Sequence, residues 1–132
     1  VVEAQKVERV RSVLREGNDV GQMMMVVGEE GTTIDDYVVY LKSEFVDAVY
    51  LQQNTFDEVD GATSEERQQY CFEKMLNVAE SRFSFDEKED ARNYFAELRM
   101  SFIDWNYTAW NSDEFAEAEK KIDNILQRKV EE

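Results

Sequence analysis

The side chains best suited to hold a small ligand follow one another near the middle of the sequence. In the run Tyr50-Leu51-Gln52-Gln53-Asn54-Thr55-Phe56-Asp57-Glu58-Val59-Asp60, three amide side chains precede an aromatic ring. Amides supply hydrogen bonds and an aromatic ring supplies a stacking surface, a mixture that suits a flat heteroaromatic ring such as adenine. The residues leave a structural alternative open, in which Phe56 anchors a hydrophobic core and the amides cap a helix.

A second polar segment lies upstream, from Val27 to Asp36, and carries four carboxylates around a turn that contains two glycines. The residues of interest are Gly28, Glu29, Glu30, Gly31, Asp35 and Asp36. A solvated acidic turn has this composition, and the two aspartates favour the N-terminus of the helix that follows, where the helix dipole is positive.

Several kinds of catalytic chemistry are excluded by the absence of histidine. Ser-His-Asp and Cys-His relays, HExxH zinc sites and di-iron bundles with ExxH all require it. The sequence also has no GxxxxGK[ST] phosphate loop and no GxGxxG motif. We therefore assign no catalytic residue and no metal ligand to this chain, and we expect no enzyme activity from it alone.

A metal site built only from carboxylates inside a helical bundle stays open as an alternative function. Carboxylates are plentiful, but no inward-facing pair at i, i+3 spacing stands out among the apolar stripes. The single cysteine, Cys71, cannot form an internal disulfide, which fits a reducing cytoplasm, and we predict that it is a small buried apolar residue.

The charge balance limits the partners. Lys and Arg number 15 against 30 Asp and Glu, which gives a net charge of −15. Such a surface repels the phosphates of nucleic acids and of anionic membranes, so we expect neither as a partner. The longest apolar run, Met23 to Val27, is too short to insert into a bilayer. A basic protein partner, or simple solubility, is what the charge favours.

The elements that position these residues are predicted to be helices. The chain contains no proline, which would break a helix interior, and only five glycines. Apolar residues recur near every 3.6 positions, and this spacing predicts an all-α, compact bundle of about six helices in a single domain spanning 1–132. The expected helices cover about 2–16, 19–27 and 33–52, then begin near 63, 84 and 112.

Turn residues and capping pairs set the predicted boundaries. Gly17-Asn18 is expected to end the first helix, and a break is expected from 53 to 62. Thr63 with Glu66, and Ser84 with Glu87, are predicted capping boxes, and Asn111 or Ser112 caps the last helix.

Two apolar clusters have alternative interpretations. The consecutive residues Met23, Met24 and Met25 are predicted to fill a core, with a soft sliding interface as the second interpretation. Trp105 and Trp110 are predicted to stabilise the outer end of the bundle, with an interface to a neighbouring subunit as the alternative.

The amide-rich run also resembles a known family. Residues 51–60, LQQNTFDEVD, are similar to the signature LQQNAFDEVD of the catalytic subunits of V-type and archaeal-type rotary ATPases. The family's order of a short helix, a VG turn, an acidic stretch and a long helix is reproduced from about Glu8 to Asp60. Beyond Glu65 the resemblance lies in the helical pattern more than in identities. Thr55 departs from the commoner alanine, which puts the shape of an adenine-binding edge in doubt.

The resemblance implies that residues 1–132 are the C-terminal helical bundle of a larger catalytic subunit whose nucleotide-binding domain is absent from this chain. That parent would be an ATP-driven proton- or sodium-translocating rotary ATPase or ATP synthase. It binds ATP or ADP with Mg, whereas no cofactor is expected in this chain. Asn54 and Phe56, and more weakly Gln53, match the part of the signature that resembles an adenine-side wall.

The resemblance also implies partners. The acidic turn takes the place of the loop that contacts the central rotor stalk, so the domain would couple nucleotide state to rotation. Its other neighbours would be non-catalytic nucleotide-binding subunits in a hetero-hexameric ring, in the cytoplasmic head peripheral to the membrane. A free-standing acidic helical adaptor that binds a basic protein is the alternative function, favoured if this chain is a complete gene product.

Overall fold

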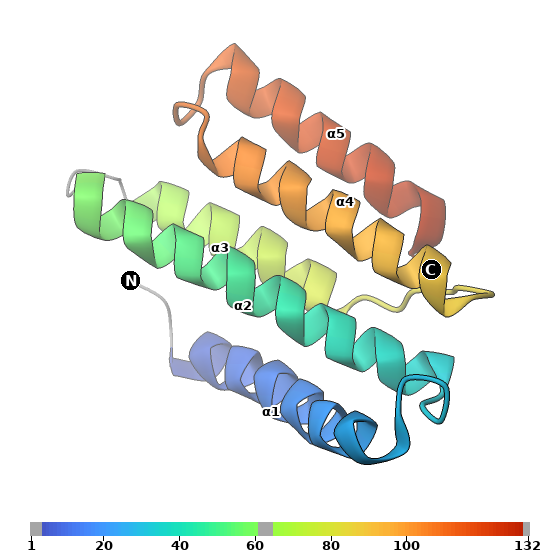
Figure 1. The fold of residues 1–132 in the computed structure, drawn as a ribbon. Coiled ribbons are helices and arrows are strands. Elements are labelled where there is room, and N and C mark those ends of the chain that lie inside the picture. Colours follow the sequence, from blue (N-terminus) through green and yellow to red (C-terminus); the bar gives the residue numbers. More distant parts are fainter. Residues whose placement is uncertain (1–3, 61–64, 131–132) are drawn as a thin grey trace.

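The computed structural model describes residues 4–60 and 65–130, with side chains described for 4–52 and 66–130. These residues form five helices (Figure 1), and no strand occurs among them beyond an isolated antiparallel bridge between Phe83 and Val130. The helices are α1 (Ala4–Val27), α2 (Ile34–Asp60), α3 (Glu65–Glu80), α4 (Lys88–Asn106) and α5 (Asp113–Lys129). The prediction of an all-α compact bundle is therefore confirmed.

The helices lie side by side and alternate in direction (Figure 1). α2 packs against α1, α3 and α4, and α5 packs against α4. The α1–α2 turn, the α3–α4 linker and the end of α5 gather at one end of the bundle, which we call the turn end. The end of α2, the start of α3 and the α4–α5 turn lie at the opposite end, which we call the amide end.

The core is rich in aromatic side chains contributed by different helices. Phe45 of α2 meets Phe102 of α4 edge to face, with ring centroids 5.0 Å apart. Trp105 then packs on Phe102 at 5.6 Å and on Phe115 of α5 at 5.0 Å. Edge-to-face pairs add stabilisation beyond the apolar area that they bury. These ring contacts join α2, α4 and α5 to one another.

The prediction that Gly17-Asn18 ends a helix is wrong. Residues 4–27 form the single helix α1, and Gly17 is buried inside it. A Cβ at Gly17 would stand 1.9 Å from Oγ of Ser43, so the glycine serves the close approach of α1 to α2. A single glycine costs a helix only about 1 kcal/mol, so the helix continues through Gly17. The two helices expected at the N-terminus are therefore a single helix.

The predicted break from 53 to 62 is wrong in its first part, because α2 continues to Asp60. The segment 32–60 has no glycine or proline. The asparagine and aspartates of the expected break disfavour a helix only weakly, by less than about 1 kcal/mol each. Thr63, the first residue of one predicted capping box, lies outside the described residues.

The capping predictions for α4 and α5 had different outcomes. The Ser84–Glu87 capping box is wrong: α4 begins at Lys88, and Glu87 precedes it without a side-chain capping bond. The backbone N–H of Ser84 instead donates to the carbonyl of Lys129 at 3.2 Å, which joins the α3–α4 linker to the end of α5. The Ser112 cap is confirmed, because its Oγ accepts from the N–H of Phe115 at 3.1 Å.

Candidate functional site

The acidic turn between α1 and α2 is a tightly bonded structure. Gly28 adopts φ +80°, a left-handed conformation that favours glycine. Its N–H donates to the carbonyl of Met24 at 2.7 Å, and its carbonyl accepts from Oγ1 of Thr32 at 2.9 Å. Thr33 then begins α2 by accepting a 3.1 Å bond from the N–H of Asp36. These bonds hold the turn in one conformation.

The second glycine of the turn is required because a side chain would not fit at its position. A Cβ at Gly31 would lie 2.7 Å from the carbonyl oxygen of Val27, a contact that only a displaced backbone would relieve. At Gly28 a Cβ would meet nothing within 4 Å, so that position is set by its φ angle alone. Gly28 and Gly31 thus serve the shape of the turn.

The four carboxylates of the turn have different surroundings. Glu29, Glu30 and Asp35 are exposed and Asp36 is half-buried. Asp35 and Asp36 occupy the first turn of α2, where the helix dipole favours negative charge, as the structural interpretation predicted. The acidic turn is therefore partly a helix-stabilising feature and partly an exposed anionic surface.

Glu29 is tied to the body of the bundle through two groups. The Nζ of Lys88 donates to its backbone carbonyl at 2.5 Å, which links the turn to the start of α4. Burial raises the pKa of Tyr37 to about 12, and a hydrogen bond to the Glu29 carboxylate adds to the shift. A neutral hydroxyl on Tyr37 therefore holds Glu29 in place at physiological pH. These two contacts stiffen the turn against the bundle.

Apolar side chains are exposed beside the acidic turn, at the end of α1. Met25 is 88% exposed and Val26 is 85% exposed, whereas Met24 is half-buried against the core. The prediction that all three methionines fill a core is therefore correct for Met24 and wrong for Met25 and for Met23, which is 39% exposed. Exposed apolar side chains that adjoin one another are typical of a surface that another protein covers.

The predicted adenine-side residues lie at the other end of α2. Gln53, Asn54 and Phe56 belong to its last turns, but their side chains lie outside the described part of the chain. Ile34 and Asn54 are about 30 Å apart along the helix axis at 1.5 Å per residue. The structure therefore keeps the two candidate sites apart and connects them by one continuous helix (Figure 1).

The neighbouring glutamine of the amide-rich run is described, and it has a structural role. Oε1 of Gln52 accepts from Nδ2 of Asn106 at 3.2 Å, and its Nε2 donates to the carbonyl of Ile103 at 3.4 Å. Arg67 of α3 donates to the carbonyl of Asn106 at 2.6 Å. This network joins three helices at the amide end. Sequence reasoning missed it, because Asn106 and Arg67 are distant in sequence and carry no motif.

Trp105 and Trp110 belong to one aromatic cluster at the amide end of the bundle. Trp110 packs on Phe115 at 5.1 Å and on Tyr70 at 5.7 Å, and Trp105 is fully buried beneath them. The hydroxyl of Tyr70 hydrogen-bonds Glu119, and this bond, together with burial, raises the pKa of Tyr70 to about 12. The cluster closes the amide end between α3, α4 and α5.

Other expectations bear on the described residues only. Cys71 is buried, as predicted. The described residues contain no group of three or more His, Cys, Asp or Glu arranged to hold a metal ion. Nor is any helix in this part of the chain long and apolar enough to cross a membrane.

These features define an all-helical bundle in which one long helix joins an acidic, apolar-edged turn to an amide-rich end. Residues 4–92 match the family described as the C-terminal domain of V and A type ATP synthase. The match covers more than half of the chain, and the chain belongs to this family.

Curated relatives agree with the family. The chain is 47% identical over 131 residues to the V-type ATP synthase alpha chain of Treponema denticola, covering 99% of this chain and 22% of the relative. It is 51% identical over 127 residues to V-type ATP synthase alpha chain 1 of Treponema pallidum, covering 96% and 22%. For the alpha chain of Borrelia turicatae the identity is 45% over 129 residues, covering 98% and 22%. The chain thus spans about a fifth of the length of these relatives. No solved structure matches it.

Proposed function

We propose that this chain is the C-terminal helical domain of the catalytic subunit of a rotary ATPase or ATP synthase, and that it transmits nucleotide-dependent movement to a central rotor stalk. The observation that carries the proposal is the continuity of α2, which runs for 27 residues from the acidic turn to the amide-rich run. The names of the relatives, V-type ATP synthase alpha chains, support the identity of the parent subunit.

Transmission of force requires a stiff element, and the packing of α2 meets this requirement. Tertiary packing supplies most of the stability of a helix in a protein, and α2, which is about 40 Å long, is supported by α1, α3 and α4. Three side chains in the middle of α2 are at most 1% exposed, namely those of Phe45, Val46 and Val49. A displacement of the amide end is therefore passed to the turn end as rigid-body motion of the bundle.

The turn end supplies the contact with the stalk in this proposal. Its bonded glycine turn, its exposed Glu30 and Asp35, and its exposed Met25 and Val26 form a firm tip with both anionic and apolar surface. Contact by shape and stiffness needs no reacting side chain. The sites proposed for the stalk are Gly28, Glu29, Glu30, Gly31, Asp35 and Asp36.

The amide end faces the rest of the subunit in this proposal. Gln53, Asn54 and Phe56 would border the adenine of an ATP or ADP that is bound, with Mg, by another domain of the parent. Residues 1–132 would form one domain of that subunit. Its neighbours would be non-catalytic subunits of a hetero-hexameric ring in a cytoplasmic head. A separate membrane sector of the same complex would translocate protons or sodium.

Photo-crosslinking in the assembled complex tests the stalk contact. A Glu30→Cys substitution in a Cys71→Ala background places one thiol at the tip, which benzophenone maleimide labels. The expected result is a light-dependent crosslink to the stalk subunit that stops repeated ATP hydrolysis. Labelling at Met100→Cys, an exposed position in the half of α4 nearer the amide end, is the matched control and is expected to give no such crosslink. Equal crosslinking from both positions, or none to the stalk from Glu30→Cys, would contradict the proposal.

A further inference from the structure

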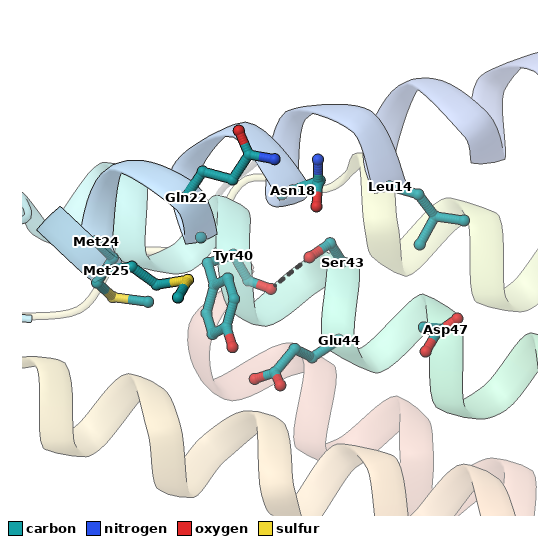
Figure 2. Close-up of a pocket in the computed structure, with 11 residues that line it drawn as sticks. Leu14, Asn18, Gln22, Met24, Met25, Tyr40, Ser43, Glu44 and Asp47 are labelled. Atoms are coloured by element: carbon teal, nitrogen blue, oxygen red, sulfur yellow. Dashed lines mark hydrogen bonds between the residues drawn. The ribbon is translucent and has the colours of Figure 1, made fainter.

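A groove of about 470 Å³ lies along the line where α1 meets α2 (Figure 2). Met24 and Met25 lie toward its turn end, and Leu14 and Asp47 lie toward its other end. It is distinct from the acidic turn, but Met25 belongs both to the groove and to the exposed apolar edge of the tip. The groove and the tip therefore form one continuous surface.

Two positions of α1 in the groove, one turn apart, carry no side chain. Gly17 and Gly21 both line it, and neither fills the space beside α2. A Cβ at Gly21 would lie 3.2 Å from the ring of Tyr40, so this side chain already occupies the closest space. The glycines thus allow α1 and α2 to approach closely, and longer side chains on either side form the edges of the groove.

The chemistry of the groove is apolar at the methionines and acidic along α2. Glu44 and Asp47 are exposed and lie three residues apart on the same helix face. Among the described residues that line the groove, none is basic. The nearby Lys42 is directed elsewhere, because its Nζ donates to the carbonyl of Ser81 at 2.5 Å. The residues of the groove therefore supply no cation to the acidic edge, although Glu44 also borders a second hollow, between α2 and α4, that Arg92 and Arg99 line.

The side chain of Glu44 is also held in place. It hydrogen-bonds the hydroxyl of Tyr40, whose ring packs on Tyr37 with centroids 6.4 Å apart. Such a bond restricts the carboxylate before a partner binds, which reduces the entropy lost on binding.

We propose that this groove docks an amphipathic helix of another subunit, one that carries lysine or arginine beside its apolar side chains. Apolar side chains of that helix would rest on Met24, Met25 and Leu14, because methionines adapt their shape to a partner. Its cations would meet Glu44 and Asp47, since complementary charge favours association and fixes register. The inference rests on the proposed function in one respect, namely that the domain works inside a multisubunit complex.

The exposed apolar edge favours a protein helix over a free cation. Met25, at 88% exposure, would remain in water if only an ion or a small polar molecule bound at Glu44. A helix that lies along the groove covers Met25, which lines it, as well as the acidic edge. The two halves of the surface are then used by one partner.

A photo-reactive side chain in the groove tests the proposal in the complete, assembled complex. p-Benzoylphenylalanine replaces Gln22, which is exposed and lines the groove, and the crosslinked peptide is identified by mass spectrometry. The expected product joins Gln22 to a helical segment of another subunit that contains lysine or arginine. A crosslink confined to this chain, a crosslink to a segment without basic residues, or no crosslink overturns the proposal.

Charge neutralisation in the same complex tests the acidic edge. Glu44→Gln with Asp47→Asn is expected to lower the Gln22 crosslink yield about fivefold at low salt and by less at high salt, as screened surface charges do. The matched control, Asp104→Asn with Glu117→Gln, removes two exposed charges from α4 and α5 and should leave the yield unchanged. Equal yields from both double variants overturn the role of Glu44 and Asp47.

This outcome is separable from the proposed function. If the Glu30→Cys probe fails to reach the stalk while the Gln22 probe reaches a basic helix, the groove stands and the stalk contact at the tip does not. The reverse pattern removes the groove and leaves the tip.

Discussion

Gly17 of α1 and Ser43 of α2 touch so closely that a Cβ on the glycine would lie 1.9 Å from Oγ and 2.1 Å from Cβ of the serine. Ser43 is buried, and its Oγ donates to the carbonyl of Tyr40 at 2.7 Å, so it is not free to turn away. This contact sets the separation of α1 and α2 and thereby the depth of the groove beside it.

Gly17→Ala is expected to destabilise the chain by about 2 kcal/mol. An alanine normally stabilises a helix by about 1 kcal/mol relative to glycine, but overpacking costs up to about 3 kcal/mol, and the upper value applies because the clash involves Cβ as well as a rotatable hydroxyl. Urea unfolding measures the difference. Adding Ser43→Gly should restore part of the loss, whereas Gly21→Ala should change stability by less than about 1 kcal/mol because only a ring edge must shift. A stabilised Gly17→Ala variant would show that the helices are not in contact there.

The hydroxyl of Tyr94 donates to the carbonyl of Ile125 at 2.9 Å and links α4 to the buried side of α5. Tyr94→Phe is expected to cost about 1 kcal/mol at neutral pH, the usual loss for one hydrogen bond. Burial raises the pKa of Tyr94 to about 12 from an ordinary value of 10.0, although nearby Arg128 opposes the shift. The folded chain therefore favours the neutral phenol.

Because the pKa is raised on folding, the stabilisation by Tyr94 is fully present below pH 10 and is lost as the pH rises toward 12. Unfolding free energies measured from pH 8 to pH 12 should thus fall more steeply for the unsubstituted chain than for Tyr94→Phe above pH 10. A difference between the two that stays constant across this range would exclude Tyr94 as the titrating group.

The sequence predicts the fold class well because its signals are local and repeated. Apolar spacing and the absence of proline indicate helices, and Ser112 is recognised as a cap because the cap and its partner are three residues apart. The sequence wrongly predicts a helix end at Gly17, because the contact that requires this glycine is with Ser43, 26 positions away in the chain. The cost of a glycine in a helix is small, so tertiary packing decides.

The candidate sites were predictable in part. The acidic turn and the amide-rich run are each a continuous stretch of sequence, and their residue types are sufficient to mark them as candidate sites. The exposure of Met25 and Val26 and the groove beside Glu44 depend on how α1 packs on α2, which single residues do not reveal. Similarly, the Gln52–Asn106 bond requires knowledge that the ends of α2 and α4 meet.

Removing charge from the turn should weaken coupling only modestly if the turn acts by stiffness and shape. Glu29→Gln, Glu30→Gln, Asp35→Asn and Asp36→Asn together are expected to lower ion transport per ATP hydrolysed by about twofold in a reconstituted complex, since exposed charges contribute little individually. The pair Glu29→Gln with Glu30→Gln is the informative control, because it retains the aspartates that stabilise the start of α2. Complete loss of ATP hydrolysis in the fourfold variant would argue against a purely mechanical role.

Phe56 offers a direct choice between the ligand-binding and the structural interpretation of the amide-rich run. In the complete subunit, Phe56→Leu keeps an apolar side chain of similar volume but removes the aromatic face. If Phe56 borders the adenine, ATP affinity should fall about tenfold, since stacking of one base on an aromatic side chain contributes about 1–3 kcal/mol. Phe56→Tyr should retain the affinity because it retains the ring, and the stability of both variants should change by less than about 1.5 kcal/mol. Equilibrium titration with ATP and urea unfolding measure the two quantities. Unchanged ATP affinity with a clear loss of stability in Phe56→Leu would instead identify Phe56 as a core anchor, and the site at the amide end would be withdrawn.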